Sequence, residues 1–313
     1  MGTTCSTFCG NCTNEVRTMD DENTAYEAKK GDIHKLPDQN GSFSEEDDEI
    51  ARPKGKASQK VGAGRFKGAT KESTHAKTNK IEEVKLANGA MYTGERKGEE
   101  RHGQGTQIWK DGSKYVGMWA NDKANGKGVL YHADGDEYEG DWENDKAHGR
   151  GTYKHANGAE YQGDWINDKQ HGNGIETWPD GAKYEGDYKH GKKDGKGKLK
   201  FADGSNYQGE FKENEINGTG VYIWTDGKTY TGEWKNNKMM GHGKLSWADG
   251  KSYEGEFQND KRHGKGRFEW KDGRIYDGEW ENGKQHGVGL FTTANNETKK
   301  GRWDKGKRQE WID

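Results

Sequence analysis

The sequence predicts an all-β fold made of stacked 23-residue units, each contributing two strands. A tyrosine recurs every 23 residues, nine times without a slip, from Tyr92 to Tyr276. A glycine follows each tyrosine two residues later, and Asp-Gly or Asn-Gly dipeptides recur with the same period. A strict period of this length indicates one small unit repeated many times, so function should lie on a long surface rather than in a single pocket.

Residues 138–160 illustrate one unit. Tyr138, Gly140 and Trp142 alternate with acidic residues, which places the rings on one face of a strand and the acids on the other. A second alternating segment, Gly149 to Tyr153, predicts the second strand. We expect a loop of roughly six residues between the two strands, and a type I′ turn at each Asn-Gly or Asp-Gly dipeptide that leads to the next unit.

The predicted core is thin and aromatic. Only 27% of the residues are hydrophobic and the mean hydropathy is −1.41, values that alone would indicate disorder, yet the chain holds 12 Trp and 14 Tyr. Glycine normally weakens a strand, so we expect flat rings from the adjoining unit to lie across bare glycine backbone. The predicted core residues are Tyr115, Gly117, Trp119, Tyr138, Gly140, Trp142, Tyr161, Gly163, Trp165, Tyr230, Gly232, Trp234, Tyr276, Gly278 and Trp280.

The repeated pattern Tyr-x-Gly-[Asp/Glu]-Trp-x-Asn-[Asp/Gly]-Lys-x-His-Gly-x-Gly-x-x-x-[Trp/Tyr/Phe]-x-Asp-Gly, from about residue 86 to residue 306, resembles the MORN repeat (membrane occupation and recognition nexus). The resemblance implies an elongated, twisted antiparallel sheet of stacked hairpins, a MORN solenoid. It also implies a scaffold at membranes, cilia, flagella or the cell cortex, and the family is often linked to phosphoinositides.

The chain divides into three parts. Residues 1–12 are a predicted acylation tip, residues 13–80 a linker predicted to be disordered, and residues 81–313 the array, with nine full repeats over 92–298 and half-repeats at both ends. An opening strand is expected near residues 81–86. Arg96 replaces the first tryptophan, and lysine replaces tyrosine at Lys299, as expected for capping units.

The N-terminal tip carries a lipidation pattern. Met1-Gly2-Thr-Thr-Cys-Ser6 fits N-myristoylation at Gly2. One myristoyl chain binds membranes only marginally, and palmitoylation of Cys5, Cys9 and Cys12 would supply a second anchor. A chance match of the start, a zinc site on the three cysteines and a disulfide framework are the alternatives. The zinc site lacks a nearby fourth ligand. The disulfide framework is disfavoured because the sequence shows no apolar signal-peptide core that would direct the chain to an oxidising compartment.

Charge is divided sharply before the array. Residues 1–50 carry four basic and twelve acidic side chains, and residues 51–80 carry nine basic and one acidic side chain. The simplest interpretation of residues 13–80 is a solvated, disordered linker, and a separate alternative is that the two blocks attract each other. A sharper one is contact with anionic lipid, at about 1 kcal/mol per basic residue. The residues assigned to that contact are Arg52, Lys54, Lys56, Lys60, Arg65, Lys67 and Lys71.

Two periodic features of the array resemble sites. Histidine precedes glycine in five units, but copies about 10 Å apart cannot share one metal ion, so a hydrogen-bonding role in a turn is favoured. Basic residues between paired glycines, such as Lys127 and Arg150, could form a phosphate-binding stripe. Pairing across strands with acids such as Asp141 and Asp164 is the favoured interpretation.

The sequence predicts a protein that is not an enzyme and needs no cofactor or metal, because no nucleophile–base constellation stands out from the periodic pattern. The slightly acidic array argues against nucleic acid. We expect a scaffold or adaptor for protein partners, with self-association as one form of partnering. It should be held peripherally by lipid on the cytoplasmic face of the plasma membrane, the cortex or a ciliary or flagellar membrane. The alternative is a phosphoinositide-binding module that recruits or controls a lipid kinase.

Overall fold

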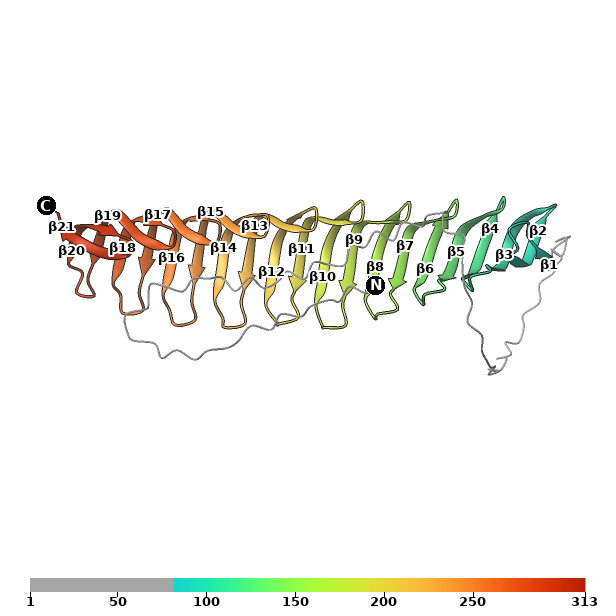
Figure 1. The fold of residues 1–313 in the computed structure, drawn as a ribbon, viewed down its shortest axis with the longest axis horizontal. Helices are drawn as coiled ribbons and strands as arrows, with labels where there is room; N and C mark the ends of the chain where they lie inside the picture. The colour runs from blue at the N-terminus through green and yellow to red at the C-terminus, as the bar shows by residue number, and fades with distance from the viewer. Residues whose placement is uncertain (1–80, 313) are drawn as a thin grey trace, which may run out of the picture. The chain divides into compact units, whose positions relative to one another are not determined.

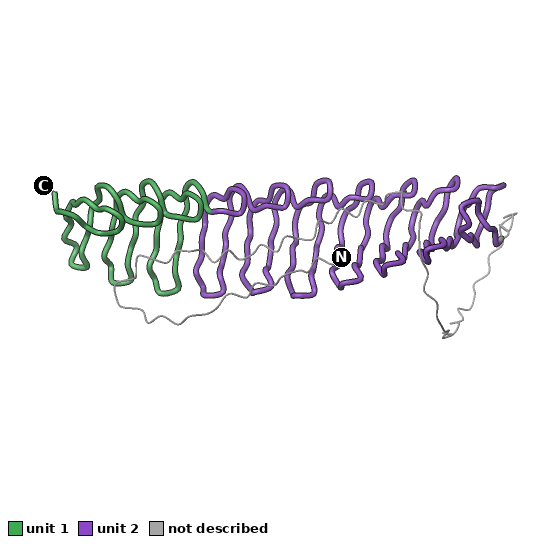
Figure 2. Tube along the Cα trace, in the orientation of Figure 1, with its two compact units in different colours: residues 1–35, 239–313 green, residues 36–238 purple. Residues whose placement is uncertain are grey.

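The computed structural model describes residues 81–312, and no residue in this range lies in a helix (Figure 1). The range divides into two units, residues 81–238 and residues 239–312 (Figure 2). Within each unit consecutive strands pair antiparallel in an open sheet, which confirms the predicted all-β hairpin array.

The strands of the first unit are β1 (Glu82–Lys85), β2 (Met91–Lys97), β3 (Glu100–Ile108), β4 (Lys114–Ala120), β5 (Lys123–Tyr131), β6 (Glu137–Glu143), β7 (Lys146–Lys154), β8 (Glu160–Ile166), β9 (Lys169–Thr177), β10 (Lys183–Lys189), β11 (Lys192–Lys200), β12 (Asn206–Lys212), β13 (Glu215–Ile223) and β14 (Thr229–Lys235). Those of the second unit are β15 (Lys238–Ser246), β16 (Ser252–Gln258), β17 (Lys261–Glu269), β18 (Ile275–Glu281), β19 (Lys284–Thr292), β20 (Thr298–Asp304) and β21 (Lys307–Trp311).

Each repeat is a hairpin closed by a two-residue turn. In the repeat of β6 and β7, Asn144 and Asp145 have φ of 51° and 67°, the left-handed pair that a type I′ turn requires. The predicted six-residue loop is therefore wrong, because the residues from Lys146 onward already belong to β7. Asn and Asp tolerate positive φ, so an Asn-Asp dipeptide closes the hairpin as well as Asn-Gly does.

The link between repeats is a wider turn. His155 N–H donates to Ala159 O at 2.8 Å and Gly158 N–H donates to His155 O at 2.8 Å, which encloses three residues. Only Gly158 has a positive φ, of 91°. The prediction of a type I′ turn at the Asp-Gly and Asn-Gly dipeptides is also wrong. These dipeptides are the last two residues of a three-residue loop, and the glycine at its end adopts the left-handed conformation.

A β-bulge interrupts the second strand of each hairpin. Gly140 faces Gly151, but the next residue, Asp141, faces His148, so Gly149 and Arg150 have no partner in β6, although both pair with β8. Gly149 has a φ of 65°, and Asp141 Oδ2 accepts the N–H of Arg150 at 3.0 Å. The glycine at 149 is therefore required by backbone conformation and interrupts the simple alternation that was predicted.

The core is a zipper of perpendicular rings. Tyr138 is fully buried, and its ring meets Trp142 of its own repeat at 5.1 Å and Trp165 of the next repeat at 5.2 Å, both edge to face. Tyr138 Oη donates to Asp141 O at 3.0 Å, and Trp142 Nε1 donates to Gly128 O of the preceding repeat at 3.1 Å. Neighbouring repeats thus share both a ring contact and a hydrogen bond.

Glycine makes room for these rings. Gly140 and Gly151 are direct partners across the hairpin, and a Cβ on Gly151 would lie 2.5 Å from Cε2 of Tyr138. The ring over the glycines belongs to the same repeat, whereas the sequence interpretation assigned it to the adjoining one. The reason is that residues two apart on a strand share a face, so Tyr138 folds over Gly140 and then over Gly151 beside it.

The predicted core residues occupy equivalent places along the array. The five predicted tyrosines are at most 1% exposed and the five tryptophans at most 7% exposed. Gly117, Gly140 and Gly163 are buried, and Gly232 and Gly278 are partly exposed.

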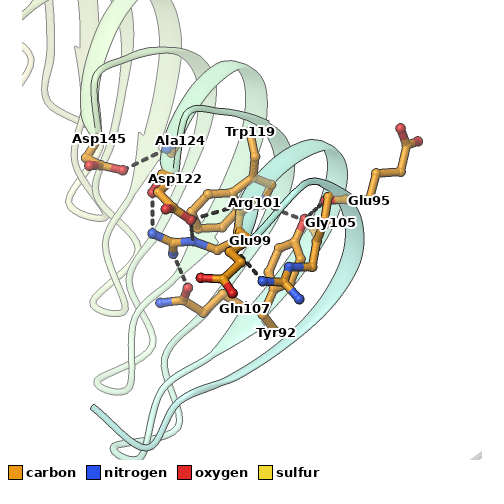
Figure 3. A network of polar contacts seen from close by, with 11 residues as sticks. Tyr92, Glu95, Glu99, Arg101, Gly105, Gln107, Trp119, Asp122, Ala124 and Asp145 are labelled. Atoms are coloured by element: carbon orange, nitrogen blue, oxygen red, sulfur yellow. Dashed lines mark hydrogen bonds and ion pairs between the residues drawn. The ribbon is translucent and has the colours of Figure 1, made fainter. Parts of the chain in front are cut away.

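Figure 3 shows the same interactions at the start of the array. Tyr92 Oη and Trp119 Nε1 each donate to a backbone carbonyl, at 2.7 Å and 3.2 Å. Arg101 occupies the position that Ala124 has one repeat later. Its guanidinium lies 4.2 Å from the centre of the Trp119 ring and binds the Asp122 carboxylate. A cation thus lies over the ring of Trp119, as Arg262 does over the ring of Trp280 in the second unit.

The closed ends of successive hairpins are joined by a ladder of hydrogen bonds. Asp168 N–H donates to Ala147 O at 3.0 Å, and Ala147 N–H donates to Asp168 Oδ1 at 2.7 Å. Asn214 and Asn237 accept equivalent bonds in later repeats. The second residue of each tight turn therefore closes its own hairpin and bonds to the preceding one.

We expect Gly151→Ala to lower the free energy of unfolding by about 1–3 kcal/mol, because the methyl group would displace the Tyr138 ring. Tyr138→Phe, which removes the hydroxyl nearest the new methyl, should cost less in the Gly151→Ala background than in the wild type. Urea unfolding of the two single variants and the double variant measures this coupling. Strictly additive costs would show that the ring does not pack on this glycine.

Asp168 offers a test of the hairpin-end ladder. Burial raises the pKa of its carboxyl, while the N–H of Ala147 and the charge of Lys146 oppose the rise. A raised folded-state pKa favours the protonated form, so its stabilising effect is present at low pH and is lost as the pH rises. Asp168→Asn should therefore match or exceed wild-type stability at pH 7, with no gain below the unfolded pKa of about 3.9.

Asp168→Ala is the matched variant without an acceptor. It should cost about 1–2 kcal/mol, because the Ala147 N–H loses its partner. Thermal unfolding at pH 3.5 and pH 7 compares the three proteins. Equal stability of the Ala and Asn variants would contradict the role of this side chain.

Candidate interaction surface

The sheet has one face covered by rings and one face that is open. On the open face of the first unit, residues of β7 to β13 surround a hollow of about 890 Å³. Its floor is the backbone of paired glycines, including Gly163 with Gly174 and Gly186 with Gly197. The hollow is lined by Arg150, Gln162, Gly163, Asn173, Gly174, Ile175, Glu185, Gly186, Asp187, Lys196, Gly197, Lys198, Gln208, Gly209, Glu210 and Thr219.

Opposite charges pair across the strands at the bulge side of this face. Lys127 Nζ lies 2.7 Å from Asp141 Oδ1, and Arg150 Nε lies 3.1 Å from Asp164 Oδ1. Burial raises the pKa of Asp141, but hydrogen bonds from Lys127 and from the Arg150 N–H outweigh it and hold the pKa below its usual value. The favoured sequence interpretation, pairing across strands, is confirmed for Lys127 and Arg150.

The acids of this row are also structural. Asp187 Oδ2 accepts the N–H of Lys196 at 2.8 Å, and Glu256 Oε1 accepts the N–H of Lys265 at 2.8 Å. The amines of Lys196 and Lys265 form no ion pair with any residue in 81–312. Where an acid occupies this position, as in these repeats, it holds the bulge, whereas Met118 takes its place in the repeat of β4 and β5 and the cation opposite varies.

The histidine row lies at the hairpin ends rather than in a shared site. Asp194 and Asn217 replace histidine in two repeats, and their side chains accept the N–H of Glu213 and Asn236 at the next tight turn. His148 Nδ1 is 3.4 Å from Glu143 Oε2 without hydrogen-bond geometry. Within the described range no group of three His, Cys, Asp or Glu side chains could hold a metal ion.

A second aromatic row borders the turns between repeats. Trp178, Phe201 and Trp224 in the first unit are partly exposed, as are Trp247 and Trp270 in the second. Cations stack on several of them, with Lys228 Nζ 4.3 Å from the centre of the Trp224 ring and Lys251 Nζ 5.4 Å from that of Trp247. The sequence pattern contained these rings, but only the structure shows them as a separate row at the edge of the sheet.

One pair of repeats has an ionic cluster in its core. Lys193 Nζ lies 2.7 Å from Glu176 Oε2, and Tyr188 Oη donates to the same oxygen at 2.8 Å. Glu176 and Lys193 are 4% and 3% exposed. Burial lowers the pKa of the Lys193 amine, and the Glu176 carboxylate opposes that shift. Burial, reinforced by Glu176, raises the pKa of the Tyr188 hydroxyl.

Sequence reasoning did not find this cluster, although a signal was present. Glu176 occupies the position of Leu199 in the next repeat and of Leu130 two repeats earlier. Lys193 occupies the position of Ile216 in the next repeat and of Ala147 two repeats earlier. A charged residue at an apolar position of a repeat predicts a buried partner. Both substitutions occur close together in the array.

The lipidation residues Gly2, Cys5, Cys9 and Cys12 lie outside the described residues, and so do the basic residues from Arg52 to Lys71. Among residues 81–312 no helix is long and apolar enough to span a bilayer.

Comparison with protein families decides the classification of the array. The sequence model of the MORN repeat family matches nine consecutive segments, at residues 92–114, 115–137, 138–160, 161–183, 184–206, 207–229, 230–252, 253–273 and 276–298. The chain belongs to the MORN repeat family. The comparison with curated proteins gives no match.

Several solved structures resemble the MORN array weakly. The TCP10 domain of Danio rerio CPAP in complex with a STIL peptide is 12% identical, with 74% of this chain and 99% of that chain covered and a TM-score of 0.41. The SAS-4 (dCPAP) TCP domain of Drosophila melanogaster, in complex with a proline-rich motif of Ana2, is 14% identical. The match covers 60% of this chain and 98% of that chain, with a TM-score of 0.32. Virginiamycin B lyase from Staphylococcus aureus is 11% identical, with 70% of this chain and 83% of that chain covered and a TM-score of 0.14.

The ionic cluster of the MORN array can be replaced by copying the next repeat. Lys193→Met alone should cost about 3–5 kcal/mol of unfolding free energy, because it leaves the Glu176 carboxylate buried and unpaired. The triple variant Glu176→Leu, Tyr188→Phe, Lys193→Ile should regain or exceed wild-type stability. These three residues are the ones found 23 positions later, at Leu199, Phe211 and Ile216.

Urea unfolding of the wild type, the single variant and the triple variant measures the three free energies of unfolding. A triple variant less stable than Lys193→Met would show that the cluster, rather than its apolar substitute, is the better core.

Proposed function

We propose that this MORN-repeat protein is a non-enzymatic scaffold or adaptor, tethered to a membrane by its N-terminus, that binds protein partners through its array at the plasma membrane, the cortex or a cilium. The observation that carries the proposal is the long open face. In the first unit its hollow crosses seven strands, β7 to β13, on a backbone floor with side chains of mixed charge along both sides. Such a surface suits an extended protein partner better than a small substrate.

The chemistry of the open face supports binding rather than catalysis. The exposed cations Lys127 and Arg150 are paired with acids at 2.7 Å and 3.1 Å. Their neighbouring acids hold backbone N–H groups. Groups engaged in this way give a surface its shape and polarity and do not converge on a reacting atom.

The membrane tether rests on the sequence of the tip. Gly2 and Ser6 match the myristoylation pattern, and Cys5 lies within reach of the same interface. Two acyl chains give the stable anchoring that a single chain does not. In this proposal the tip selects the membrane and the array selects the partner.

The tether is tested with the full chain expressed in a cell that acylates proteins. Gly2→Ala should shift the protein from the membrane fraction to the soluble fraction, because both acyl groups depend on the first. Gly10→Ala, a glycine of the same tip outside the acceptor position, is the matched control and should leave the distribution unchanged. The intact mass of the N-terminal peptide shows directly whether acyl groups are attached. An N-terminal peptide without acyl groups would contradict the proposed membrane tether.

The alternative, a phosphoinositide-binding module, is an outcome of a vesicle assay. Non-acylated full-length protein is mixed with neutral vesicles, with phosphatidylserine vesicles and with phosphoinositide vesicles at two salt concentrations. We expect salt-sensitive binding to both anionic compositions, which corresponds to the basic residues from Arg52 to Lys71. Binding confined to phosphoinositide vesicles would favour the alternative over the scaffold.

A further inference from the structure

Three lysines gather on the open face of β10 and β11 without a matching set of acids. Lys183 and Lys200 are direct partners across the two strands, an arrangement of like charges that destabilises a sheet. Lys198 lies on the same face, opposite Glu185. Lys183 Nζ is 3.4 Å from Glu185 Oε2, whereas Lys198 and Lys200 form no ion pair or hydrogen bond through their amines within residues 81–312.

These lysines line a hollow together with apolar side chains. The hollow has a volume of about 480 Å³ and is bounded on its far side by Val221 and Ile223 of β13. Ile223 is 44% exposed and so offers apolar surface at this hollow. We call the group Lys183, Lys198, Lys200, Val221 and Ile223 the lysine hollow. Glu185 also lines the hollow, so three amines face one carboxylate beside the partly exposed Val221 and the exposed Ile223. This combination matches an acidic peptide that also carries apolar side chains.

The chain contains such a peptide. Residues 43–50, Phe-Ser-Glu-Glu-Asp-Asp-Glu-Ile, place five consecutive carboxylates between Phe43 and Ile50. This segment lies outside the described residues. We propose that residues 43–50 bind in the lysine hollow of the same chain, with carboxylates on the three amines and an apolar end against Val221 and Ile223.

The length of the intervening chain permits this contact. About 30 residues separate Ile50 from the first described residue, and a chain of this length spans up to about 100 Å when extended and about 30 Å on average if flexible. β10 is nine strands from β1, which corresponds to about 40 Å at 4.8 Å per strand. The segment can therefore reach the hollow, and its attachment raises its local concentration to the millimolar range.

The basic residues from Arg52 to Lys80 compete for the same carboxylates. They are close in sequence, but charge alone gives them no preferred arrangement. The lysine hollow differs because its cations are carried by paired strands at defined positions and are adjacent to Val221 and Ile223. Binding there would also bury Phe43 or Ile50 against Val221 and Ile223.

The consequence is an internal competitor on the open face. A partner that approaches β10 to β13 would have to displace residues 43–50, and displacement would release the N-terminal tip from the sheet. This inference does not depend on acylation or on the proposed scaffold function, since it concerns two segments of one chain.

The test measures the distance between the segment and the hollow in the full chain. In a background of Cys5→Ser, Cys9→Ser and Cys12→Ser, dyes are attached to Ser42→Cys and to Thr225→Cys, which lies two residues after Ile223. We expect efficient energy transfer at low salt. The variant K183E/K198E/K200E should lose it. Adding E45K/E46K/D47K/D48K/E49K to that variant should restore it, because both partners are then reversed.

The matched control is K189E/K212E/K235E, which makes the same change in net charge at exposed lysines near the tight turns of the same unit. It should retain the transfer of the wild type. Equal loss in this control would show diffuse attraction and overturn the proposal, as would unchanged transfer in K183E/K198E/K200E. Failure of the reversed pair to recover transfer would also count against it. Circular dichroism of each variant confirms that the sheet is intact.

Discussion

The structure depends on one contact, a tyrosine ring laid across two bare glycines and held between two indole or phenyl rings. Tyr138 makes this contact with Gly140 and Gly151 below it and with Trp142 and Trp165 at its edges. Gly140, Gly151 and Trp142 belong to the same repeat as Tyr138, whereas Trp165 belongs to the next repeat. A single hairpin therefore cannot complete its own core, and stability must be shared along the array.

This arrangement tolerates changes in the outer ring better than changes in the tyrosine. Trp142 is replaced by Tyr188 and Phe211 in later repeats, and these rings still meet a tyrosine edge to face at about the same distance. The nine tyrosines do not vary, because each hydroxyl also donates to a backbone carbonyl three residues on. Beside Tyr188 the core holds Lys193 and Glu176, whereas beside Phe211 in the next repeat it holds Ile216.

The open face is nearly independent of this core. Its side chains alternate with the core residues along every strand, so they can change without disturbing a ring. Only the acid at the bulge is shared, because Asp141 and its equivalents hold a backbone N–H that would otherwise lack a partner. A MORN array can thus carry different interaction surfaces on one framework, which agrees with a scaffold whose specificity lies in the residues beside the glycine row.

The sequence by itself determined that each unit holds two strands and that the periodic tyrosines and tryptophans form the core, because the pleat has a period of two and the repeat a period of 23. It did not determine the bulge at Gly149, which shifts the alternation within β7. It did not determine which dipeptide closes the hairpin. Asn144-Asp145 and Asn157-Gly158 both accept left-handed backbone, and only the pairing register decides between them. It also did not bring Glu176 to Lys193 or Lys183 to Lys200, because those contacts depend on which strands lie side by side. Neighbouring residues set the local preference for strand or turn. Contacts between side chains on different strands depend on the pairing register and form only when the strands pair.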